Sequence, residues 1–351
     1  MLWDRLKRLF AKTEQDEEEE EEGAGTEVLP DPIYLEPDQN PWGVPVLDLR
    51  PITLRLTTMS GNHECAVNSS SFGRDDGTGF IGVEPEIDCV IPVGLRFPID
   101  GVLADGALFL PEVMEHKWAI FYHRGRMIFV RSWTRQVTAI AEVQTHGDFA
   151  EIVNVRGTFL AGEASPSITV QTLEFLLRTH VLDLPYPLPL PEGFARDVKA
   201  AAVAAFAVAG DLAHFATWHA VPAEPIAKTV RSTSLLHFAV LRGDTAKIRE
   251  LIQSGVPPGL IAKDGTTPLM LASEKRDREG VSLLLERGAD AGAADARGFT
   301  ALHRAAELGE FEIAELLLRN GASPLAEAGG HTPLSLAKLR GEARLVALLS
   351  R

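Results

Sequence analysis

The sequence predicts an α+β protein, in which a mostly antiparallel, β-rich N-terminal domain precedes an all-α repeat solenoid. Between residues 43 and 190, short β-branched and aromatic segments alternate with turn-forming residues, as in a series of antiparallel strands. Between residues 231 and 351, the same amino acids return at a nearly constant spacing, which indicates a helical repeat. Hydrophobic residues make up 45% of the 351 residues, so the chain can bury a core and is not wholly disordered.

The first segment, residues 1–12, predicts a basic amphipathic helix. Its apolar residues recur at spacings of three and four, which places them on one helical face. Such a helix could bind weakly to a membrane surface or dock in the groove of a partner. The alternative is a frayed end that folds back on the domain, since a helix of about three turns is marginal in water.

The next segment, residues 13–42, predicts a disordered linker that is acidic and contains prolines. Residues 13–40 hold twelve acids and no base, so most of the formal charge of −15 lies there. An acidic segment can bind a basic partner, but a solvated spacer is the simpler interpretation. The repeat region 231–351 holds 16 bases and 15 acids, so its own charge says little about its partner.

Simple counts exclude several classes of protein. No run approaches the ~20 apolar residues of a membrane-spanning helix, and the N-terminus shows no secretory signal. Two cysteines, Cys65 and Cys89, are too few for a disulfide scaffold, which favours a reducing, cytoplasmic setting. No nucleic-acid partner is expected, because no region has a strong positive excess.

The β-rich domain, residues 43–190, is predicted to end in one helix. This helix begins at Ser165-Pro166, where an N-cap residue precedes proline, and it runs to about Asp183. The predicted strands are 44–49, 52–58, 87–93, 107–110, 118–122, 127–133, 137–143 and 151–155.

A candidate second site lies on the hairpin in this domain. Its residues are Arg131, Trp133 and His123. Arg131 shares a strand face with Phe129 and Trp133, so it could stack on their rings or bind an anion. An ordinary structural arginine at a sheet edge is the alternative. Residues 117–134 resemble a hairpin motif of small uncharacterised bacterial domains, a resemblance that implies no activity.

Three kinds of residue share one register in the last third of the chain. Leucine recurs at 236, 269, 302 and 334, alanine at 239, 272, 305 and 337, and glycine at 255, 288 and 321. The leucine and alanine rows are expected to face the inside of stacked helices. The glycines are expected to end the second helix of each repeat in a left-handed conformation.

The repeat resembles the ankyrin repeat over residues 231–351. Thr267-Pro268-Leu269-Met270, Thr300-Ala301-Leu302-His303 and Thr332-Pro333-Leu334-Ser335 follow the pattern of that family, and Ser234-Leu235-Leu236-His237 is a weaker first copy. Arg276 departs from the usual glycine between the helices. The resemblance implies four repeats, structural roles for His237 and His303, and a protein partner. Residues 191–230 are expected to form a degenerate repeat or a capping helix pair, since an array needs its apolar end covered.

Carried over from the family by position, the resemblance also implies contact residues on turns and first helices. They are Arg231, Thr233, Leu241, Arg242, Asp264, Thr266, Glu274, Lys275, Arg297, Phe299, Glu307, Leu308, His331, Leu339 and Arg340. These residues mix both charges with apolar groups, which favours a protein patch over a polyanion. Phe299 is the expected anchor, and the alternative is that it packs on the neighbouring repeat.

The leading hypothesis is a non-enzymatic interaction protein that needs no cofactor. An enzyme with its chemistry in residues 43–190 is one alternative, and it would need side chains that converge in a pocket. The side chains considered are His116, His123, Asp75 and Glu115. An immunity or inhibitor protein that blocks a basic target is another alternative. No metal site is expected, because residues 63–65 with Cys89 lack paired zinc-ligand spacing.

Overall fold

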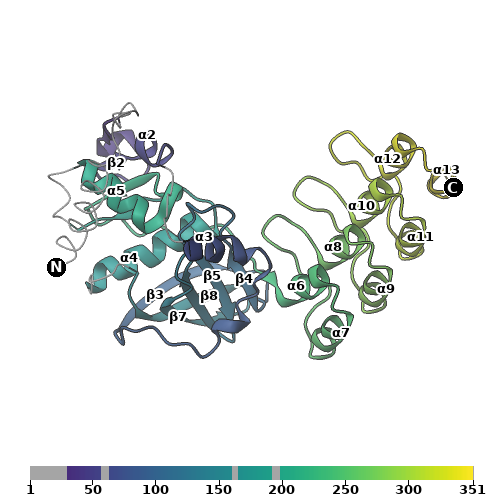
Figure 1. Cartoon of the computed structure of the whole chain (residues 1–351), viewed down its shortest axis with the longest axis horizontal. Helices are drawn as coiled ribbons and strands as arrows, with labels where there is room; N and C mark the ends of the chain where they lie inside the picture. The colour runs from purple at the N-terminus through teal and green to yellow at the C-terminus, as the bar shows by residue number, and fades with distance from the viewer. Residues whose placement is uncertain (1–29, 57–62, 160–164, 192–197, 351) are drawn as a thin grey trace.

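The computed structural model describes residues 30–56, 63–159, 165–191 and 198–350. Figure 1 shows a sheet-containing lobe that leads into a stack of helices. The amphipathic helix predicted for residues 1–12 and the linker predicted for residues 13–29 lie outside the described residues.

The linker prediction is wrong for residues 30–42, which are folded. Strand β1 (Ile33–Leu35) pairs antiparallel with β2 (Val46–Asp48), and the short helix η1 (Pro37–Gln39) joins them. β1 is one of the two outer strands of its sheet. The prolines in this segment had suggested an extended linker. They are compatible with an edge strand, because proline beside such a strand removes no hydrogen bond from the sheet.

The larger sheet has seven strands in the order β11-β4-β5-β6-β7-β8-β3, and every neighbouring pair is antiparallel. Its strands are β3 (Val90–Pro98), β4 (Gly106–Phe109), β5 (Trp118–His123), β6 (Arg126–Arg131), β7 (Val137–His146), β8 (Phe149–Gly157) and β11 (Thr233–Ser234). The prediction of a mostly antiparallel α+β domain is therefore confirmed. The strand expected at 52–58 is wrong, because α2 (Arg50–Thr53) places Pro51 in the first turn of a helix.

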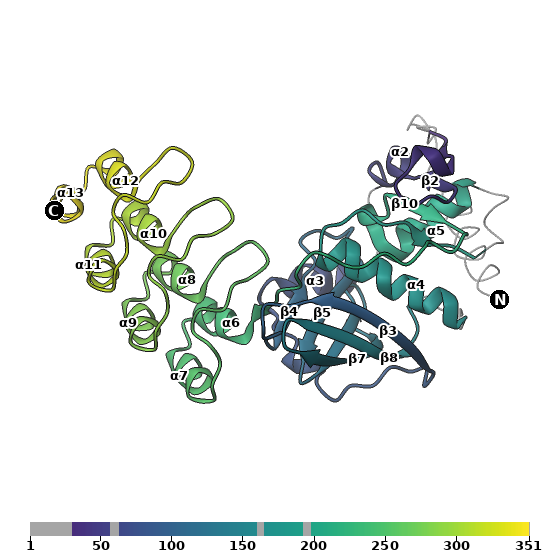
Figure 2. The ribbon, with the colours of Figure 1, turned by 180° about the vertical axis from the view of Figure 1, so that it is seen from behind.

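Side chains alternate between two cores on the faces of this sheet. Trp118 and Phe129 face the larger core, which α4 (Pro166–Leu176), its continuation η4 (Leu177–Val181) and α5 (Val198–Ala209) complete. Figure 2 shows α4 along this side of the sheet. Phe121 and Ile128 face a smaller core with Phe72 and Phe80, near α3 (His63–Ser70), η2 (Ser71–Arg74) and η3 (Thr78–Phe80).

Residues 191–230 differ from the expected helix pair or degenerate repeat. The described part of this segment holds one α-helix, α5, followed by the single turn η6 (Gly210–Leu212) and strand β10 (Phe215–Thr217). β10 lies between β2 and β9 (Leu188–Pro189) in a four-stranded sheet. The alanines of α5 pack into the larger core of the sheet domain.

Four helix pairs follow, stacked side by side (Figure 1). They are α6 (Leu235–Arg242) with α7 (Thr245–Gln253), α8 (Pro268–Glu274) with α9 (Arg278–Glu286), α10 (Ala301–Leu308) with α11 (Phe311–Arg319), and α12 (Pro333–Arg340) with α13 (Ala343–Leu349). The alanine row is buried throughout, and the predicted glycines Gly255, Gly288 and Gly321 have φ of 96°, 89° and 91°. As predicted, the alanine row therefore faces the inside of the stack, and the glycine row ends the second helices in a left-handed conformation.

The array is joined to the sheet domain through its first helix pair. Phe238 of α6 is 1% exposed and completes the smaller core of the sheet. Just before it, β11 pairs with β4, where a Cβ on Gly106 would lie 2.1 Å from the Thr233 carbonyl oxygen. Arg242 Nη1 donates to Asp76 Oδ2 at 2.6 Å from the end of the same helix. The two parts therefore share a core.

We expect Phe238→Ala to destabilise the sheet domain as well as the array, by about 3–5 kcal/mol, because the cavity opens between them. All five tryptophans precede residue 231, so tryptophan fluorescence during urea unfolding follows the part of the chain before the array. Leu317→Ala, at a buried position in α11, is the matched control and should move the helical circular-dichroism signal more than the fluorescence. Equal fluorescence midpoints for Phe238→Ala and wild type would contradict the shared core.

Candidate functional site

The loops between successive helix pairs form three fingers on one side of the array (Figure 1). We define finger 1 as residues 254–266, finger 2 as 287–299 and finger 3 as 320–331. Most of the predicted contact residues in fingers and first helices are exposed, namely Asp264, Glu274, Lys275, Arg297, Glu307, His331, Leu339 and Arg340. Thr266, Phe299 and Leu308 are half-buried. We call these eleven residues the repeat face.

Phe299 is the aromatic side chain of the repeat face. Its ring lies 5.4 Å from the His303 ring and beneath two guanidinium groups, with Arg297 Cζ at 5.4 Å and Arg304 Cζ at 5.0 Å from its centroid. Its backbone N–H donates to Asp295 Oδ1 at 2.8 Å. The structure therefore combines both interpretations of Phe299, since the ring packs on its neighbours and yet stays partly accessible.

Four predicted contact residues of the first repeat are engaged within the chain instead. Arg242 binds Asp76 and the Arg74 carbonyl, and Leu241 packs against the smaller core. Thr233 lies in β11, and Arg231 Nε donates to Asp100 Oδ2 at 2.6 Å. Burial raises the pKa of Asp76, but hydrogen bonds from Thr78 and Arg242 outweigh it and lower this pKa overall. These residues position the array, so we do not include them in the repeat face.

His237 and His303 tie each of their helices to the next finger. The Nδ1 of each accepts a backbone N–H at its own helix start, from Ser234 at 3.2 Å and from Thr300 at 3.1 Å. Nε2 therefore carries the proton and donates to the Thr266 carbonyl at 3.1 Å or the His331 carbonyl at 3.3 Å. Ser335 of the fourth repeat accepts the Thr332 N–H at 2.9 Å in the same way.

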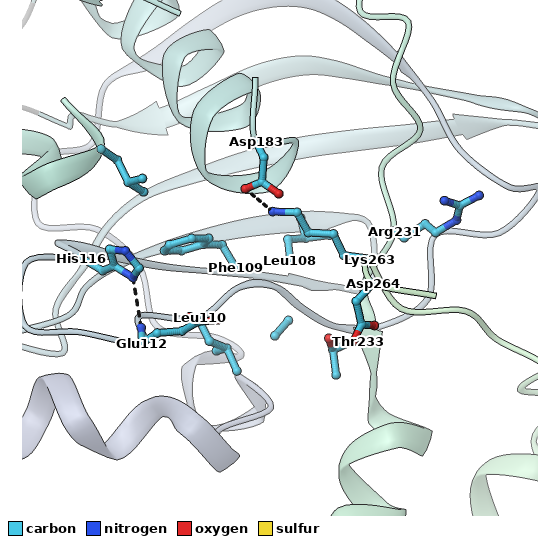
Figure 3. Close-up of a pocket in the computed structure, with 12 residues that line it drawn as sticks. Leu108, Phe109, Leu110, Glu112, His116, Asp183, Arg231, Thr233, Lys263 and Asp264 are labelled. Atoms are coloured by element: carbon cyan, nitrogen blue, oxygen red, sulfur yellow. Dashed lines mark hydrogen bonds and ion pairs between the residues drawn. The ribbon is translucent and has the colours of Figure 1, made fainter. Parts of the chain in front are cut away.

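A cavity of about 520 Å³ lies where finger 1 meets the sheet domain (Figure 3). We call it the junction pocket. Its lining includes β4, the loop after it, the segment before β11 and finger 1. Lys263 of finger 1 crosses to the sheet domain, where its Nζ contacts Asp183 Oδ1 at 2.7 Å and donates to the His180 carbonyl at 3.1 Å. Arg231, Thr233 and Asp264, which were predicted as partner contacts of the array, all line this pocket.

The candidate second site on the hairpin is not one site. Arg131 stacks on Trp118, with Cζ 4.6 Å from the ring, and donates to the carbonyls of Ala207 and Val208 at the end of α5. Burial lowers the pKa of Arg131 to about 10. Trp133 Nε1 donates to the Met114 carbonyl, while His123 lies at the other end of β5, where Nε2 contacts the Asp76 carbonyl oxygen at 2.7 Å. Each of these side chains has a structural partner.

The side chains considered for catalysis do not all meet in one pocket. His116 lines the junction pocket, where Nδ1 accepts the Glu112 N–H and Nε2 lies 3.7 Å from Asp211 Oδ1. His123 lies at the opposite end of β5, and Asp75 pairs with Arg135. Within the described ranges, no cluster of three or more His, Cys, Asp or Glu side chains could hold a metal ion. None of the helices described is long and apolar enough to cross a membrane.

Comparison with known families identifies the repeats. The family model described as "Ankyrin repeats (3 copies)" matches residues 236–328. The match runs from the first helix of the array into finger 3, as the resemblance of the sequence implied. The C-terminal third of the chain therefore carries ankyrin repeats. No curated protein matches the chain.

Acid is expected to destabilise the array through the two histidines. Burial lowers the pKa of His237 to about 4 and also lowers the pKa of His303. Histidines in the unfolded chain have a pKa near 6.5, so they take up protons at a higher pH than these two do in the folded chain. The free energy of unfolding therefore falls as the pH drops from about 6.5 towards 4. The expected slope is at most about 1.4 kcal/mol per pH unit for each histidine.

Urea titrations followed by circular dichroism at pH 7 and pH 5 test this slope. His303→Gln, which cannot be protonated, should be less stable at pH 7 but lose less stability between the two pH values. An unchanged pH dependence in that variant would mean that His303 is not a titrating group.

Proposed function

We propose that this chain is a non-enzymatic interaction protein, in which the ankyrin repeats capture a protein partner on the repeat face. Ankyrin repeats in general bind protein partners, and the match over residues 236–328 supports that general role here. The observation that carries the assignment to the repeat face is Phe299, a half-buried ring with two guanidinium groups on the finger side of the array.

The surroundings of Phe299 are typical of a protein-binding surface. Arg297 has 71% of its side chain exposed, whereas Arg304 has 21% and is fixed by Asp295 at 3.3 Å. Leu339, further along the array, is 73% exposed. Aromatic and arginine side chains within a polar rim contribute most of the energy in many interfaces. A partner with an acidic group beside an apolar one would match this surface.

The same geometry favours binding over the two alternatives. An enzyme would need a general acid or base held in a pocket. Of the side chains considered for that role, His116 lines the junction pocket, and both of its ring nitrogens have neighbours. An inhibitor of a basic target would show association that weakens steeply with salt, because surface charges would dominate it. The repeat face carries both charges, so we expect only a mild salt dependence.

The test is a full-length Phe299→Ala variant, because fragments would cut through the core that Phe238 completes. The partner is first captured with wild-type protein, and its affinity for each variant is then measured by isothermal titration calorimetry. We expect the partner to bind more weakly by about 1–3 kcal/mol, or about five- to 150-fold. The thermal unfolding midpoint should stay close to that of wild type.

Phe311→Ala is the matched control. Phe311 lies at the start of α11, is also half-buried, and has Arg344 Cζ at 4.5 Å from its ring, but it belongs to a second helix. It should leave the affinity unchanged. If both variants bind as tightly as wild type, or both lose the same affinity, the repeat face is not the binding surface.

A further inference from the structure

One edge of the seven-stranded sheet is only half covered. β11 pairs with Gly106 and Ala107 of β4, at Ser234 and Thr233. Ahead of β11 the chain turns away, because Val230 bridges to Ile99 and donates its N–H to the Pro98 carbonyl at 2.9 Å. Within the described residues, Leu108 and Phe109 therefore have no partner strand on this edge. An open edge is a ready template for another strand.

The junction pocket opens along this uncovered part of β4. The register of β4 against β5 shifts between Ala107 and Phe109, which marks a bulge at Leu108. Bulges re-aim side chains at sheet edges and binding sites. Here the Phe109 ring lies between two imidazoles, 5.3 Å from the His116 ring and 4.9 Å from the His180 ring. Leu108, Leu110 and Leu212 add to an apolar lining.

The charges of the pocket are unbalanced. Its two cations are already paired, Lys263 with Asp183 at 2.7 Å and Arg231 with Asp100 at 2.6 Å. Two further lining carboxylates, Glu112 and Asp264, have no cation partner in the part of the chain that the structure describes. The Asp264 carboxylate accepts the N–H and the hydroxyl of Thr266, at 3.0 and 2.7 Å. Figure 3 shows Glu112 and Asp264 on opposite sides of the pocket.

We propose that the junction pocket binds an extended, basic peptide segment of a partner protein, which adds as a strand to the open edge of β4. Strand addition supplies main-chain hydrogen bonds for affinity, and pockets for alternate side chains supply specificity. A lysine or arginine would face Glu112 or Asp264, and β-branched or aromatic neighbours would cover Phe109. The cavity of about 520 Å³ lies within the range of pockets that hold ligands of drug size.

The wall formed by finger 1 is held in place before any ligand arrives. Lys263 links finger 1 to Asp183 and to the His180 carbonyl, both of which belong to the sheet domain. A preformed wall reduces the ordering that binding requires. This inference rests on the proposed function in one respect, since the ligand is a segment of a protein partner. The junction pocket shares only Asp264 with the repeat face.

The test uses random eight-residue peptides displayed on phage and selected against the full-length protein. We expect the enriched peptides to share one lysine or arginine flanked by β-branched or aromatic residues, and to lack proline within that stretch. The double variant Glu112→Lys/Asp264→Asn should select an aspartate or glutamate at that place instead. Both positions are exposed, and asparagine can keep the turn that Asp264 makes with Thr266.

The peptide most enriched by wild type is then synthesised and measured by fluorescence anisotropy. We expect about a tenfold loss of affinity for the double variant, and recovery when the basic residue of the peptide is replaced by glutamate. Two further peptides carry N-methyl groups on alternate amides, one on the odd-numbered and one on the even-numbered residues. We expect one of the two to bind at least tenfold more weakly, because only one set of N–H groups faces β4.

Three results would overturn the proposal: no enrichment above background, the same sequences from both forms of the protein, or equal binding of all N-methylated peptides. Phe299→Ala separates this inference from the proposed function, because it should leave peptide affinity unchanged. If the peptides fail while Phe299→Ala weakens the captured partner, only the junction pocket is refuted. If the peptides bind as expected and Phe299→Ala has no effect on the partner, only the repeat face is refuted.

Discussion

The packing of Phe238 into the smaller core is the contact on which the rest of this structure depends. It fastens the first helix of the array to the sheet domain, next to the β11–β4 pair and the ion pair between Arg242 and Asp76. A repeat array must cover the apolar surface at its end. Here the sheet domain provides that cover, and the same contact fixes where finger 1 stands. Both candidate surfaces therefore take their positions from one junction.

The array could be predicted from sequence, whereas the junction could not. A helical repeat is visible in the sequence as a regular period, because each repeat needs the same leucine, alanine and glycine at equivalent positions. Nothing comparable marks the contact between Arg242 and Asp76, which lie 166 residues apart. The two-residue strand β11 is also too short to leave an alternating pattern. Junctions of this kind depend on tertiary packing, which periodicity does not report.

Errors in the sheet domain have similar local causes. Residues 52–58 are apolar and β-branched, but Pro51 favours a helix start, and tertiary context decides such short segments. Val203 and Gly210 lie 33 residues before Leu236 and Gly243, as in a further repeat, yet the alanines of this helix pack under a sheet. Arg131 and His123 looked like site residues because charged groups beside aromatic ones are common in sites. In this fold Arg131 satisfies carbonyls at the end of α5, and His123 contacts a loop carbonyl.

The hydrogen bonds from His237 and His303 to the fingers are not evenly distributed along the array. His237 links the first repeat to finger 1, and His303 links the third repeat to finger 3, but the second repeat has Met270 at this place. Between the second and third repeats, a main-chain bond from the Ala296 N–H to the Asp264 carbonyl at 3.0 Å joins the fingers, and it carries no titratable group. A second proton on either ring would sit on Nδ1, which could then no longer accept the N–H of Ser234 or Thr300, whereas the Nε2–H bond to the finger would remain. Acid is therefore expected to act on the starts of α6 and α10, in the first and third repeats, while the second and fourth repeats carry Met270 and Ser335 at the equivalent place and do not titrate there.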